Sequence, residues 1–182
     1  MSAGHGHGEH GGNKKIALLI SLLALVLAFA ETLGKSAQTA ALASNIEASN
    51  LWAFFQAKTI RQTVLRTAAE EVSISEKGEA AKKQVDKWRE TAARYQNEPD
   101  TNEGRDQLAA RAKAAEKKRD RSMDSYHNFE SAAAAAQIAI VLASASIIAA
   151  VPALVWLACT LGLVGVAFSV IGFWFPTAVH LF

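Results

Sequence analysis

Apolar residues are concentrated in three stretches of the chain, and a long polar region separates the first stretch from the second. The first stretch, Ile16–Ala30, carries no charge and continues helically to Leu33. The other two lie near the C-terminus and meet at Val151-Pro152. A membrane-spanning helix needs about 20 apolar residues, with a lower limit near 17. The pattern therefore predicts transmembrane helices over residues 16–33, 132–151 and 153–175.

The first stretch has a second interpretation, a cleaved secretory signal peptide. Lys14 and Lys15 would be its basic region, and Ala28-Phe29-Ala30 fits a small-x-small cleavage site. The long tail before the lysines and the helical continuation favour an uncleaved anchor. Both interpretations keep Lys14-Lys15 in the cytoplasm and send the polar region across the membrane.

The polar region, residues 34–131, is predicted to be a helical hairpin. A heptad register runs from Ile46 to Tyr95 without a skip, which indicates a long helix with a coiled-coil-like seam. Its polar members Thr67, Glu71 and Gly78 lie together, so we expect a kink around Val72–Gly78. The register positions are Ile46, Asn50, Ala53, Ala57, Ile60, Val64, Thr67, Glu71, Ile74, Gly78, Ala81, Val85, Trp88, Ala92 and Tyr95.

The turn of this hairpin is expected at residues 97–104, because Pro99 breaks helices and the neighbouring Asp, Asn and Gly favour turns. A second helix would follow, with a weaker apolar seam. The stretch from Leu33 to Pro99 is about twice as long as that from Pro99 to Ala132, so at about 1.5 Å per residue two straight arms would differ by roughly 50 Å. We therefore expect the first arm to bend, either along the membrane interface or near Gly78.

Charge is segregated as in membrane proteins. Nearly all Lys, Arg, Asp and Glu residues lie between Lys35 and Glu130. The formal net charge of +2 is too small to indicate a nucleic-acid-binding protein. The single cysteine, Cys159, lies in an apolar stretch and permits no disulfide within one chain. Basic residues near the N-terminal stretch predict a cytoplasmic N-terminus and an extracytoplasmic hairpin.

Residues 1–15 begin with a Gly- and His-rich segment and are expected to be a disordered tail. His5, His7 and His10 carry imidazoles that suit Zn(II), Cu(II) or Ni(II). A flexible tail that binds metal only as any His-rich peptide does is favoured, because no second cluster of ligands completes a closed site. No cofactor is predicted.

An aromatic cluster bracketed by polar residues marks the start of the polar region. Its aromatic residues cannot share one helical face, so part of the cluster needs a partner such as lipid headgroups or another chain. This makes it the candidate interaction motif. Its residues are Asn45, Glu47, Asn50, Trp52, Phe55, Gln56 and Lys58.

Catalytic signatures are missing from the sequence. It contains no phosphate-binding glycine loop, Cys-x-x-Cys, His-Glu-x-x-His or nucleophile elbow. The predicted spans carry no Asp, Glu, Lys or Arg along their apolar runs, which disfavours an ion or proton pathway within one chain. We therefore expect a protein that is not an enzyme.

Two segments together resemble a family of bacterial membrane proteins, DUF4337. They are Asn45–Lys58 and Gln137–Ser144, accompanied by Arg119-Asp120, His127 and Phe129. The resemblance covers nearly the whole chain. The family pattern has Asn followed directly by Glu, whereas Ile46 separates Asn45 from Glu47 here. It implies a three-span helical protein of the bacterial inner membrane and supplies no activity or functional residues.

The predicted fold is an all-α membrane protein, with a coiled-coil-like helical hairpin between the first and second of three transmembrane helices. The favoured function is a membrane-anchored scaffold whose partners are lipids, its own copies or other membrane proteins. An accessory protein that responds to metal or envelope state through its His tail is the alternative. An enzyme with a site between subunits ranks last.

Overall fold

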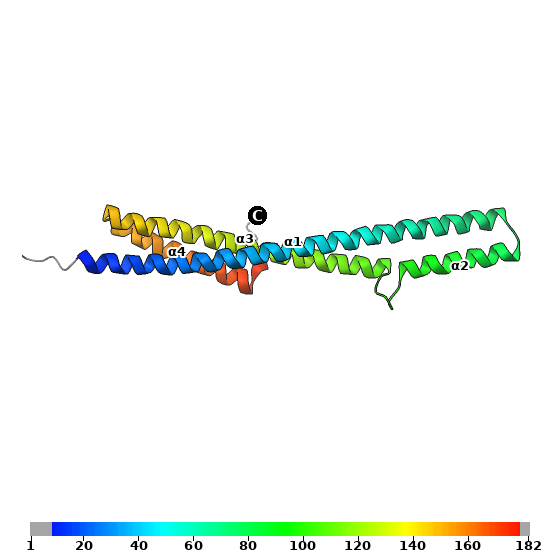
Figure 1. Cartoon of the computed structure of the whole chain (residues 1–182), viewed down its shortest axis with the longest axis horizontal. Coiled ribbons are helices and arrows are strands. Elements are labelled where there is room, and N and C mark those ends of the chain that lie inside the picture. The colour runs from blue at the N-terminus through cyan, green and yellow to red at the C-terminus, as the bar shows by residue number, and fades with distance from the viewer. Residues whose placement is uncertain (1–8, 179–182) are drawn as a thin grey trace, which may run out of the picture. The chain divides into compact units, whose positions relative to one another are not determined.

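The computed structural model describes residues 9–178, with side chains from residue 13 onward. These residues form four α-helices and a short 3₁₀ turn, and they contain no strand, which confirms the all-α class (Figure 1). The elements are α1 (Glu9–Ser75), α2 (Glu79–Gln96), α3 (Arg105–Ala149), α4 (Pro152–Trp174) and η1 (Pro176–Ala178).

Two compact units make up the described chain. The terminal unit combines the start of α1, up to Ala41, with the chain from Asp120 onward. The central unit is Leu42–Arg119 and contains the end of α1, all of α2 and the start of α3.

Helix α1 is one continuous helix of 67 residues, longer than we predicted. It begins at Glu9, so residues 9–15 are helical where we expected tail, because an apolar helix that has already formed extends at little cost. The helix also continues without a break through residues 34–36. Gly34 is buried, and a Cβ there would lie 3.3 Å from that of Phe129, so glycine lets the two helices approach closely.

The chain reverses direction at residues 76–78, between α1 and α2, which corrects the turn expected at 97–104. Ser73 and Ser75 hydroxyls donate to the carbonyls of Glu70 and Glu71 at the end of α1. Gly78 then adopts an extended conformation before α2. The loop at 97–104 only joins α2 to α3, and both helices pack against α1. The bend expected near Gly78 is thus a full reversal of the chain, and this reversal accounts for the mismatch in length.

The terminal unit packs its helices through small residues. Leu23 of α1, Ala139 and Ala143 of α3 and Ala158 of α4 form one buried cluster. A Cβ on Gly165 would lie 3.1 Å from the Ala132 carbonyl oxygen, so the backbones of α3 and α4 are in close contact. Small residues four positions apart, such as Ala139 and Ala143, permit this close approach.

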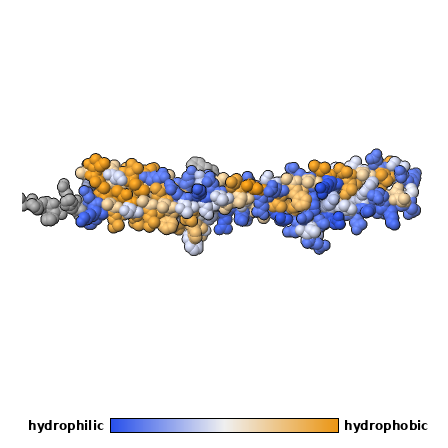
Figure 2. All heavy atoms as spheres, viewed as in Figure 1, coloured by the Kyte–Doolittle hydropathy of each residue, from blue (hydrophilic) through white to orange (hydrophobic). Residues whose placement is uncertain are grey.

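Three helices are long and apolar enough to cross a membrane: α1, α3 and α4. They expose large apolar side chains around the terminal unit, among them Leu18 on α1, Ile148 on α3 and Trp156 on α4. Figure 2 shows hydrophobic residues gathered over the terminal unit. Length, composition and exposure together indicate a membrane protein. The connection between α3 and α4 lies at Ala150-Val151, as the proline at the start of α4 predicted.

Candidate functional site

The predicted interaction motif lies on α1 in the central unit, and the structure divides its residues between two faces. Trp52, Phe55 and Lys58 point towards α2 and α3 and are buried or half-buried. The exposed members are Asn45, Glu47, Asn50 and Gln56. Three of the seven motif residues therefore pack within the chain.

Lys58 is the centre of the inward half. Its side chain is only 6% exposed, and its ammonium donates to Glu98 Oε2 at 2.9 Å. A second carboxylate, Glu103, lies 3.9 Å away, and the rings of Phe54 and Tyr95 flank the ammonium. A buried ammonium needs such partners because its desolvation is otherwise unfavourable. Lys58 thus fixes the 97–104 loop onto α1.

Gln62, one turn further along α1, joins all three helices. Its Nε2 donates to the Ala92 carbonyl of α2 at 2.8 Å, and its Oε1 accepts from Arg105 at the start of α3. Arg105 also donates to Gln96 Oε1 at 2.9 Å and lies over the ring of Phe55. The Gln62 amide and the Arg105 Nη1 group therefore hold the junction of α2 and α3 against α1, whereas the buried Arg105 Nε has no hydrogen-bond partner among the described residues.

Trp52 joins α1 to α3 at a point that is nearer, along the sequence, to the predicted first membrane span than Lys58 is. Its Nε1 donates to Glu116 Oε1 at 2.8 Å, and its ring meets Phe55 edge-on at 5.4 Å between centroids. Asn45 accepts a longer bond, 3.4 Å, from Arg119. These pairs set an antiparallel register between α1 and α3.

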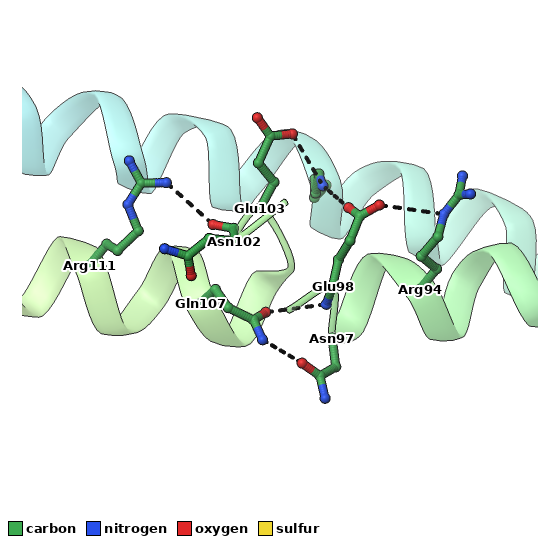
Figure 3. A network of polar contacts seen from close by, with 8 residues as sticks. Arg94, Asn97, Glu98, Asn102, Glu103, Gln107 and Arg111 are labelled. Atoms are coloured by element: carbon green, nitrogen blue, oxygen red, sulfur yellow. Dashed lines mark hydrogen bonds and ion pairs between the residues drawn. The ribbon is translucent and has the colours of Figure 1, made fainter. Parts of the chain in front are cut away.

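The 97–104 loop is held by its own polar contacts, shown in Figure 3. Gln107 accepts from the Glu98 backbone nitrogen at 3.3 Å and donates to the Asn97 side chain. Arg94 lies 3.7 Å from Glu98 Oε1, and Arg111 donates to the Asn102 carbonyl. The loop therefore packs as a structured part of the junction.

The Lys58 ammonium, through its hydrogen bond, holds the pKa of the Glu98 carboxyl below the ordinary value of 4.5. A depressed folded-state pKa contributes stability that is present above the ordinary value and is lost as pH falls through the lowered one. We expect the central unit to lose stability in acid, and Glu98→Gln to flatten that loss. Unfolding midpoints between about pH 5 and pH 3 measure it. Equal acid dependence in both proteins would contradict the role of the pair.

The metal-binding hypothesis falls largely outside the described residues. His5 and His7 are not described, and His10 lies in α1 with its side chain undescribed. Among the described residues, no group of three or more His, Cys, Asp or Glu residues is placed to hold a metal ion.

Gln62, Glu98 and Arg105 are the central residues that the sequence analysis missed. The heptad register selected an apolar face of α1 that is exposed, whereas the packed face lies beside it and includes Ala48, Leu51 and Lys58. A second heptad pattern runs through these inward positions, and it is the signal in the sequence that could have identified the packed face. In α2 the same register succeeded, since Val85 and Ala92 are buried.

The sequence profile of a family described as "Domain of unknown function (DUF4337)" matches residues 12–175. The chain belongs to the DUF4337 family. In this DUF4337 protein the match covers α2, α3, α4 and all of α1 except its first three residues, so the contacts of Lys58 and Gln62 and the membrane-length helices lie within the family's domain. No curated protein and no solved structure shows a significant match.

Proposed function

We propose that this DUF4337 protein is a membrane-anchored helical scaffold that associates with its own copies and has no catalytic centre. The observation that carries the proposal is the division of α1 in the central unit. Its inward polar residues Lys58 and Gln62 bind α2, α3 and the loop between them, whereas large apolar residues on the other side, such as Ile60 and Val64, are exposed.

The polar contacts of Lys58 and Gln62 suit a scaffold because they stiffen a helical unit that has little apolar core. The main buried cluster of the central unit is small and built largely from alanines, with Leu51 and Leu108 as its large members. A small core leaves limited stability, and association with partners adds burial. Lipids, further copies of the chain and other membrane proteins are the partners we propose.

We also propose an inner-membrane location in bacteria, with the N-terminus in the cytoplasm and the central unit in the periplasm. Lys14 and Lys15 flank the first apolar stretch and support this orientation. A membrane-impermeant thiol reagent should label Gly78→Cys in intact cells whose outer membrane has been permeabilised. Labelling only after rupture of the inner membrane would reverse the proposed orientation.

Self-association is tested by lysine-reactive crosslinking in isolated membranes. The central unit carries exposed lysines, including Lys77, Lys82 and Lys83, that can react. We expect a discrete ladder of crosslinked chains whose yield does not fall when the protein is expressed at lower density. A single-chain band alone, with lysines shown to be modified, would refute the scaffold.

A further inference from the structure

The outward face of α1 in the central unit carries an apolar stripe that no described part of the chain covers. Ile46, Ile60, Val64 and Ile74 are between 53% and 80% exposed, and the alanines between them are exposed as well. Figure 2 shows hydrophobic residues along this part of α1. We call this stripe the outer seam; its positions are Ile46, Asn50, Ala53, Ala57, Ile60, Val64, Thr67, Glu71 and Ile74.

The spacing of the outer seam alternates between four and three residues, which is the a and d pattern of a coiled coil. A strict a and d stripe is narrower than the face of a helix that packs into a globular core or lies on a membrane. Ser49, Gln56, Arg61 and Glu70 flank it with polar groups of mixed charge. The width and the polar flanks of the outer seam therefore fit a second helix better than a lipid surface.

We propose that the outer seam binds the outer seam of a second copy of this chain, in a parallel and in-register coiled coil. The inference rests on the proposed self-association and names its surface. Every copy enters the membrane through the same first stretch, so the α1 helices that leave it start on the same side and run in the same direction.

Charge and polarity along the seam fit this parallel pairing. In a parallel coiled coil a g residue of one helix faces the next e residue of the other. Here Gln56 faces Arg61 and Glu70 faces Ser75, so no two like charges meet at these positions. Asn50 occupies an a position, where two facing amides hydrogen-bond with each other and fix the register.

The polar residue near the C-terminal end of the outer seam limits the stability of the pairing. Glu71 also occupies an a position, so in the pair two carboxylates approach each other near the reversal at 76–78. Their repulsion weakens the pairing at that end. The stable part of the interface therefore runs from Ile46 to Val64.

Cysteine crosslinking of the full chain in lipid nanodiscs tests the proposal, in a Cys159→Ala background. Ile60→Cys should form an intermolecular disulfide under mild oxidation, because identical d positions face each other in this geometry. Arg66→Cys is the matched control: it is exposed on the same helix but off the seam, and should give at most background yield. Adding Val64→Lys, at an exposed position, should lower the association at least about tenfold by opposing two charges.

The outcomes separate this inference from the proposed function. A high yield for Ile60→Cys that Val64→Lys abolishes supports the outer seam. Equal yields for Ile60→Cys and Arg66→Cys, in a protein that lysine crosslinking shows to be associated, would overturn the seam and leave the scaffold standing. A protein that is monomeric in both assays would overturn both, and capture of a different protein by Ile60→Cys would assign the seam to that partner instead.

Discussion

Replacing Leu108 with alanine is expected to lower the unfolding free energy of the central unit by about 2 to 5 kcal/mol. Leu108 is completely buried in a cluster with Leu51 and three alanines, Ala48, Ala112 and Ala115, and the alanines are too short to fill the space that it would leave. An unfilled cavity adds to the lost burial. We therefore expect a value in the upper half of the range.

Hydrogen exchange of the intact protein in mild detergent measures this effect, because the amides of α2 exchange when the central unit opens. Leu42→Ala is the matched control. Leu42 is 60% exposed on α1, so its loss should change the stability by no more than about 0.5 kcal/mol. Unchanged protection of α2 in Leu108→Ala would show that Leu108 does not organise this core.

Gly104→Ala is expected to cost about 1 to 3 kcal/mol by overpacking the loop between α2 and α3. A Cβ at Gly104 would collide with the backbone nitrogen of Glu98 and with Gln107 Oε1, and would lie 3.0 Å from the Asn97 carbonyl carbon. Backbone atoms cannot move aside as a flexible side chain can. The loop should open and withdraw Glu98 from Lys58.

Gly78→Ala is the control for this prediction, since it makes the same chemical change at the other turn. A Cβ at Gly78 meets nothing within 4 Å, and the backbone there is extended. Alanine lowers the entropy of the unfolded chain, and this offsets the less favourable helix cap. We therefore expect little change in the free energy of unfolding of the central unit. Exchange of the amides in residues 97–104 should rise in Gly104→Ala alone. Equal exchange in both variants would contradict the close packing of the loop.

The sequence predicts the helical class, the three membrane-length stretches and the turn before Pro152, because each depends on local composition. It also predicts the packed face of α2, where Val85 and Ala92 are apolar and buried. These features follow from apolar periodicity and from proline, and neither needs knowledge of distant contacts.

The position at which the chain reverses, residues 76–78, and the packed face of α1 depend on contacts between distant residues, which local sequence patterns do not reveal. Pro99 is the strongest helix breaker in the region, but α3 continues along the same helix, α1, because Arg105 and Gln62 hold it there. The packed face of α1 uses Lys58 and Gln62, whose burial depends on partners 40 and 30 residues away in the sequence. A hydrophobic pattern cannot identify a buried polar residue before its partner is known.

The number of chains in the intact complex tests the central claim most directly. Native mass spectrometry of the full-length protein, released from lipid nanodiscs, measures it without a crosslinker. The self-associating scaffold predicts a discrete mass of two or more chains, which the charge introduced by Val64→Lys shifts towards one if the outer seam forms the interface. A single-chain mass across the accessible range of protein concentration would contradict the account.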